Sequence, residues 1–96
     1  MKQKNRFLRF AVECGAKLGE QDARKLVEEA LVQVIGSNGI AKHRVEFRKF
    51  DEAAQVFWLR CSSAGVDEVV AAIALKRFFE GKDIALRLQL VSGSLK

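Results

Sequence analysis

The chain has 96 residues, of which 49% are hydrophobic and 30% are charged. This composition is typical of a folded globular protein and excludes an intrinsically disordered one. The length suffices for a single domain, residues 1–96, with one modest core. Seventeen Lys and Arg against twelve Asp and Glu give a net charge of +5, which favours a polyanionic partner.

Membrane and metal partners are not expected. No stretch approaches the ~20 apolar residues of a membrane span, and the N-terminus lacks the apolar centre of a signal peptide, so we expect a cytoplasmic location. Cys14 and Cys61 each lie in an apolar, strand-like run, which favours buried reduced thiols over a disulfide. With His43 as the one histidine and no CxxC pair, a zinc site is not predicted.

The hydrophobic pattern predicts four strands and two helices. Two-residue alternation predicts strands at 6–14, 40–50, 56–61 and 84–91. Apolar residues at three- and four-residue steps predict a helix over 20–35, with Gly36 in the left-handed conformation after its end. A second helix should begin at a Ser62 or Ser63 cap and stop at Gly81, and turns are expected at 37–39 and 51–55.

The order βαββαβ indicates an α+β fold. Right-handed crossovers and a single apolar stripe on each helix favour a four-stranded antiparallel sheet with two helices on one face. In the last strand, alternation should bury one set of residues and expose the other. The buried set is Ile84, Leu86, Leu88 and Leu90, and the exposed set is Ala85, Arg87 and Gln89.

The uncovered sheet face should carry rings interleaved with arginines. Its predicted members are Phe7, Arg9, Arg44, Arg48, Trp58, Arg60 and Arg87. Rings can stack on RNA bases while guanidinium groups neutralise phosphates. The alternative is that an open face must be polar anyway, and that Phe7 or Trp58 packs against a further helix or a partner protein.

Basic residues elsewhere extend the candidate RNA-binding set. Lys4 and Arg6 precede the first acidic residue, Glu13, and Lys42 lies beside Arg44. For the N-terminal lysines the alternative is a solvated, flexible terminus. The sequence predicts no catalytic residue, because the histidine has no nucleophile and acid marked beside it and no phosphate-cradling GxxxxGK loop is present.

Several stretches in register resemble one known family. They are Lys4–Leu8, Gly39–Lys42, Trp58–Cys61, Val66–Val69, Ala71–Leu75 and Val91–Lys96. Together they span nearly the whole chain, and their order and spacing resemble the protein component 2 family of archaeal and eukaryotic ribonuclease P, also called the POP-five family. Family members usually continue past the Val-Ser-Gly motif with basic residues and a short helix, whereas this sequence stops at Lys96.

The resemblance implies a ferredoxin-like, RRM-like domain that acts as a non-catalytic, RNA-binding subunit of an endoribonuclease, the ribonucleoprotein ribonuclease P. Its RNA would remove the 5′ leader from precursor tRNA in tRNA processing, with Mg²⁺ held by the RNA and no cofactor on the polypeptide. Implied partners are ribonuclease P RNA, precursor tRNA, the TIM-barrel-like protein component 3 and a second copy of the chain. Lys96, the last residue of the matching stretches, joins the candidate RNA-binding residues.

Two other functions fit the predicted topology. The first is a regulatory or oligomerisation module that binds a small metabolite. The second is an acyl-phosphate hydrolase, although the segment Gly15–Gly19 is a poor match to the glycine-rich anion loop expected after the first strand.

Overall fold

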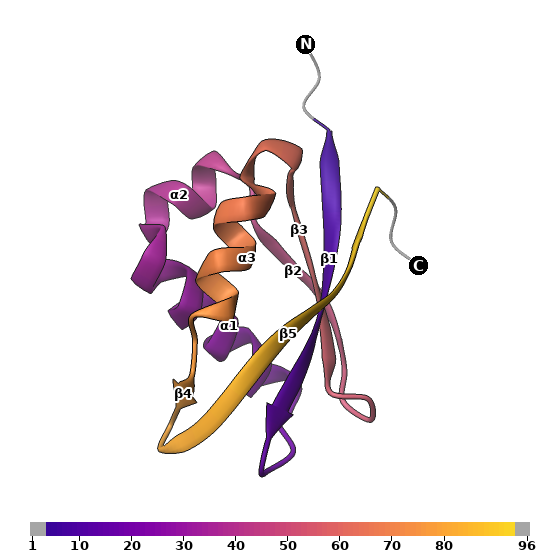
Figure 1. Cartoon of the computed structure of the whole chain (residues 1–96), viewed down its shortest axis with the longest axis vertical. Coiled ribbons are helices and arrows are strands. Elements are labelled where there is room, and N and C mark those ends of the chain that lie inside the picture. The colour runs from indigo at the N-terminus through magenta and orange to yellow at the C-terminus, as the bar shows by residue number, and fades with distance from the viewer. Residues whose placement is uncertain (1–3, 94–96) are drawn as a thin grey trace.

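The computed structural model describes residues 4–93. In chain order these residues form β1 (Asn5–Cys14), α1 (Glu20–Val34), α2 (Gly36–Lys42), β2 (Glu46–Asp51), β3 (Val56–Ser62), the short 3₁₀ helix η1 (Ser63–Gly65), α3 (Val66–Ala74), β4 (Phe78–Phe79) and β5 (Lys82–Ser92). The strands pair antiparallel in the order β2-β3-β1-β5-β4. The helices lie together on one side of this sheet (Figure 1).

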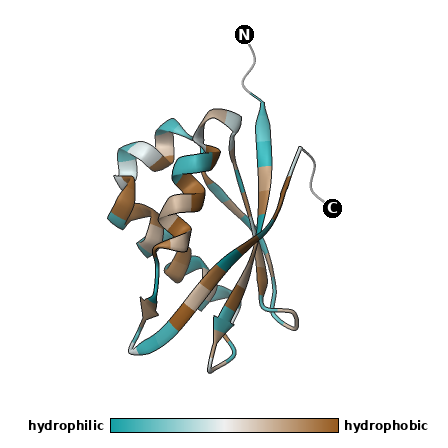
Figure 2. Ribbon diagram, in the orientation of Figure 1, coloured by the Kyte–Doolittle hydropathy of each residue, from teal (hydrophilic) through white to brown (hydrophobic). Residues whose placement is uncertain are grey.

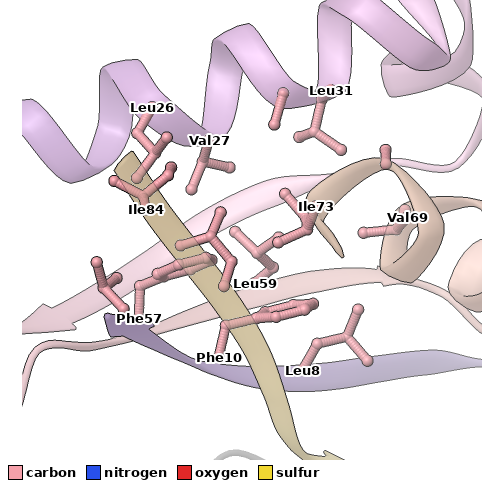
Figure 3. Packing of buried hydrophobic residues seen from close by; sticks show 14 of the residues in the cluster. Leu8, Phe10, Leu26, Val27, Leu31, Phe57, Leu59, Val69, Ile73 and Ile84 are labelled. Atoms are coloured by element: carbon pink, nitrogen blue, oxygen red, sulfur yellow. The ribbon is translucent and has the colours of Figure 1, made fainter. Parts of the chain in front are cut away.

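The core lies between the helices and one face of the sheet. Alternate residues of β1 and β3 supply its lower layer, with Leu8, Phe10, Phe57 and Leu59 fully buried. Helices α1 and α3 cover this layer, as the close view in Figure 3 shows. The rings of Phe10 and Phe57 stack with their centroids 5.2 Å apart. Alternation along the strands is visible as alternating colours in Figure 2, and it makes one sheet face apolar.

Helix α1 agrees with the sequence prediction, because one regular apolar stripe specifies it. It ends at Val34, and Gly36 follows with a φ of +69°, the left-handed conformation that glycine adopts without strain.

The predicted turn at 37–39 and strand from residue 40 are wrong. Residues 36–42 form α2 instead, and the strand begins only at Glu46. Gly39 makes this possible, since its backbone amide donates to Ile35 O and a Cβ there would lie 2.7 Å from Cβ of Ile35. Ile35 and Ile40 pack against the core, a contact that overrides the local turn signal. His43 therefore caps the end of α2 and does not lie in a strand.

The second predicted helix is too long and lacks its predicted serine cap. Helix α3 ends at Ala74, and neither Ser62 nor Ser63 caps it through a side-chain hydrogen bond. Phe78 and Phe79 instead pair with β5 across a two-residue turn, Glu80 and Gly81, whose φ angles are +48° and +80°. Positive φ at both central residues is the geometry that joins tight hairpins. The sheet therefore has five strands within residues 4–93, against the four expected.

Two register shifts change which residues face the core, one where β1 pairs with β5 and one where β2 pairs with β3. In β5 the shift lies between the pairs Phe10–Leu88 and Arg9–Leu90. Ile84 and Leu86 are buried as predicted, but Leu88 is 40% exposed, and Leu90 turns to the opposite face because it pairs with Arg9. An extra residue in one strand of a pair produces this change of side.

The cysteines are both free. Cys61 is fully buried, and burial raises the pKa of its thiol, whereas Cys14 is only partly buried. Among the described residues, no helix is both long enough and apolar enough to cross a membrane.

Candidate nucleic-acid interface

The sheet face opposite the helices carries three arginines from three strands. In β1, Phe7, Arg9 and Ala11 alternate with the buried residues of the core. Their partners across the sheet are Arg60 opposite Phe7, Trp58 opposite Arg9, and Arg87 opposite Ala11. Because directly opposed residues in an antiparallel pair point to the same side, Arg9, Arg60 and Arg87 share one face. We call this surface the open face.

Trp58 lies at the centre of the open face but is only 4% exposed. The guanidinium carbon of Arg9 and the ammonium nitrogen of Lys49 each lie 5.5 Å from the centroid of its ring. Both distances are within the range of cation–π attraction. Trp58 therefore does not present an uncovered ring to solvent, as a base-stacking platform requires, although the alternation predicted its side of the sheet correctly.

Carboxylates neutralise part of the positive charge of the other arginines, Arg48, Arg60 and Arg87. Glu46 Oε1 accepts a hydrogen bond from Arg48 at 3.0 Å and also lies 3.6 Å from Arg60 Nη1. Glu13 Oε2 accepts one from Arg87 Nε at 2.7 Å. These side chains are about a third or more exposed, and exposed ion pairs contribute only about 0–1 kcal/mol. A phosphate group can therefore replace either carboxylate at little cost.

Arg9 differs from the other arginines of the open face. Within residues 4–93 it forms no ion pair, and its Nε is buried without a hydrogen-bond partner. Its positive charge is therefore not neutralised by a neighbouring acid, and its position is set by the ring of Trp58. This makes Arg9 the strongest single phosphate-binding candidate on the face.

The β2 residues differ from the prediction. A register shift lies between Phe47 and Lys49, so Lys49 rather than Arg48 is paired with Trp58. Arg48 is the additional residue of β2 at this shift. Its guanidinium still donates a hydrogen bond to Glu46. Arg44 is not in the strand at all, because it lies in the turn after α2 with a φ of +53°. The prediction that Arg44 lies on the strand face is therefore wrong.

Sequence reasoning missed Lys49. The spacing of Phe47 and Phe50 could have indicated the register shift in β2, because two rings three residues apart cannot both face the core in a regular strand. Both are partly buried against the core, and the extra residue between them is what allows it.

A second basic group lies at the end of the sheet where β1 begins. It contains four of the candidate RNA-binding residues, Lys4, Arg6, Lys42 and Arg44. The backbone of Ser63 donates to Lys4 O at 2.7 Å, and that of Ser62 donates to His43 O at 2.8 Å, so the two basic segments are brought to the same end. Arg6 pairs with Cys61 and therefore points to the helix side, away from the open face. Lys96 lies outside the described residues.

No group of three or more His, Cys, Asp or Glu side chains suited to a metal ion occurs within the part of the chain that the structure describes. The one histidine is buried, and its Nε2 lies 3.0 Å from Glu68 Oε2.

Comparison with known proteins identifies the family. The model of the Rpp14/Pop5 family matches residues 6–96. Ribonuclease P protein component 2 of Pyrococcus abyssi is 28% identical over 96 residues, which cover 100% of this chain and 81% of that protein. The component of the same name from Thermococcus kodakarensis is 29% identical, with 100% and 80% covered.

The fold has a relative among solved structures. A chain in a cryo-EM structure of yeast ribonuclease MRP superposes with a TM-score of 0.77 at 14% sequence identity, covering 100% of this chain and 79% of that one. The family match covers nearly all of the sequence, so this chain belongs to the Rpp14/Pop5 family.

Proposed function

We propose that the protein is an RNA-binding subunit of ribonuclease P that supports removal of the 5′ leader from precursor tRNA. The observation that carries this proposal is similarity over all of this chain to proteins named ribonuclease P protein component 2, together with the family match. The open face supports it physically, because it collects arginines from three strands on a chain with a net charge of +5. Phosphate contacts dominate affinity in such interfaces.

We also propose that the fold is ferredoxin-like and related to RNA-recognition-motif domains. The strand order β2-β3-β1-β5 and the antiparallel pairings support this assignment. On this view α2 and β4 are additions to a βαββαβ sandwich. The assignment explains how one sheet face stays free of helices.

The proposed role is electrostatic. Regions of folded RNA repel one another through their phosphates, and cations fixed on a protein surface lower that repulsion. The RNA would carry the Mg²⁺ and the hydrolysis, while Arg9, Arg60 and Arg87 stabilise the active RNA fold. Ribonuclease P RNA, precursor tRNA, the TIM-barrel-like protein component 3 and a second copy of the chain are the proposed partners.

The test is the Mg²⁺ requirement of the reconstituted enzyme. Ribonuclease P RNA with this chain and component 3 should cleave precursor tRNA at lower Mg²⁺ than the RNA alone. Combining Arg9→Ala, Arg60→Ala and Arg87→Ala should move the requirement back toward that of the RNA alone.

The matched control removes three positive charges elsewhere, by Lys17→Ala, Arg24→Ala and Lys25→Ala. These exposed residues lie outside the open face, so the control should keep the wild-type requirement. An equal effect of both triple variants would show that net charge matters and that the open face does not. No effect of the wild-type chain on the Mg²⁺ requirement would contradict the proposed function itself.

A further inference from the structure

Trp58 is in cation–π contact with both Arg9 and Lys49, and we call the three residues the Arg9–Trp58–Lys49 stack. Arg9 is the partner of Trp58 on β1, and Lys49 is its partner on β2. Each cation lies 5.5 Å from the ring centroid, and the ring is almost entirely buried. An aromatic side chain that stacks on a base must offer a ring face to that base. In this structure Trp58 is buried, and two of the sheet's own cations lie over its ring.

We propose that this stack is a binding site for the RNA phosphate backbone, in which Trp58 positions two cations and does not itself stack on a base. The inference rests on the proposed function and specifies how the open face recognises RNA. Arg9 supplies the main contact, because no carboxylate among the described residues neutralises it. Lys49 supplies a second cation from a strand about 10 Å away from β1.

Trp58 increases affinity by restricting the motion of these cations. A long cationic side chain free in solvent loses much rotamer freedom when it binds a phosphate, and a side chain already held against a ring loses less. The neighbouring arginines Arg60 and Arg87 are held in place by Glu46 and Glu13 instead. Their ion pairs must exchange a carboxylate for a phosphate, whereas Arg9 has no such competitor.

Recognition by this stack has a consequence for specificity. Phosphates occur in every sequence and in both single strands and duplexes, so contacts to them position a protein without reading bases. The stack should therefore bind duplex RNA as well as single strands, and with little sequence preference. A platform of exposed rings would instead favour single strands, whose bases are free to stack.

Trp58 is the one tryptophan of the chain, so its fluorescence reports directly on the proposal. The probes are an oligouridine single strand and a duplex RNA of equal length, titrated into the full chain at low salt. We expect both RNAs to bind. Trp58 emission should be protected from acrylamide quenching in the free protein and in both complexes. Strong quenching of Trp58 by the single strand, absent with the duplex, would show base stacking and overturn the proposal.

Variants test the roles of the three residues. Arg9→Ala should weaken binding to both probes roughly fivefold and reduce the slope of log affinity against log salt by about one. Lys49→Ala should act in the same direction. Trp58→Phe should keep most of the affinity and the full slope, since a smaller ring still holds the cations. Loss of single-strand binding alone in Trp58→Phe would contradict the proposal.

Arg24→Ala is the matched control, because Arg24 also lies over a ring, 4.6 Å from the centroid of Phe47, but belongs to α1 on the helix side of the sheet. It should leave both affinities within about twofold of wild type. Thermal unfolding of every variant separates lost binding from lost folding, and the wild-type fluorescence titration stands whether or not Trp58→Phe folds.

The outcomes also separate this inference from the proposed function. If the wild-type chain binds ribonuclease P RNA but Arg9→Ala leaves affinity and salt slope unchanged, the stack is not the phosphate site and the subunit role stands. If the wild-type chain binds neither probe nor ribonuclease P RNA, both proposals fail.

Discussion

The imidazole of His43 lies so close to the backbone of Gly65 that a Cβ atom on residue 65 would come within 2.5 Å of Cγ of His43. The same ring is buried and holds Glu68 through Nε2 at 3.0 Å. The connection between α2 and β2 is thereby fixed against η1 and the first turn of α3. Lys42 and Arg44, the neighbours of His43 in the chain, depend on that contact for their positions.

Replacement of Gly65 should therefore destabilise the fold by steric overlap. The φ of Gly65 is −96°, a negative value that does not require glycine, so the overlap with His43 is the main obstacle to the change. Gly65→Ala should lower the free energy of unfolding by about 1–3 kcal/mol. Urea denaturation measures this, with Gly15→Ala as control because nothing lies within 4 Å of a Cβ there. Equal stability of the two variants would contradict the close contact.

Phe57 should dominate the stability of the sheet core. Its ring is fully buried and stacks on Phe10 at 5.2 Å and on Phe47 at 6.0 Å. Phe57→Ala should lower the free energy of unfolding by about 3–5 kcal/mol. The same substitution at Phe78, which is 55% exposed, should cost less than about 1 kcal/mol. A comparable loss in both variants, measured by denaturant titration, would be inconsistent with the core described.

The pair Lys25–Glu80 predicts a small pH dependence of stability. Lys25 Nζ donates to Glu80 Oε2 at 2.8 Å, and this hydrogen bond lowers the pKa of Glu80 and raises the pKa of Lys25. Because the carboxyl pKa is lowered in the folded state, its stabilising contribution is present above the unfolded-state pKa and is lost as pH falls through the folded-state pKa. The lysine contribution is present at neutral pH and is lost as pH rises through its raised pKa.

Glu80→Gln should therefore be less stable than wild type near neutral pH, and the difference should vanish in acid. Denaturation at a series of pH values and low ionic strength gives the two profiles. High salt should reduce the difference, since both side chains are exposed and screened. If wild type is still more stable than Glu80→Gln below the folded-state pKa of Glu80, the ion pair is not the source of the stability difference.

Removal of a carboxylate from the open face should strengthen RNA binding. Glu46 contacts both Arg48 and Arg60, so Glu46→Gln releases two guanidinium groups for phosphates. Affinity for duplex RNA should rise about threefold, with a steeper salt dependence. Glu28→Gln, an equal change of charge on α1, should have little effect. Weaker binding by the Glu46 variant would indicate that Glu46 is needed to hold the arginines in place.

Part of the candidate site follows from local alternation. Phe7, Arg9, Trp58 and Arg60 could be assigned to one face because β1 buries every second residue from Leu8 to Val12 and pairs with β3 without a register shift. The position of Lys49 could not be read this way, since it depends on a register shift that forms only when β2 pairs with β3. The contacts of Trp58 with Arg9 and Lys49 likewise join residues that are 49 and 9 positions distant in the chain.

The sequence by itself determined the regular elements and the sign of the surface charge. Periods of two and 3.6 residues specify β1, α1 and β3 without reference to the rest of the chain. The net positive charge follows from counting Lys and Arg against Asp and Glu. The tertiary structure alone decided α2, β4, the two register shifts and the covering of Trp58. Each of these depends on pairing between elements or on packing against the core, and the free energy of such contacts outweighs local preferences that amount to a few tenths of a kcal/mol per residue.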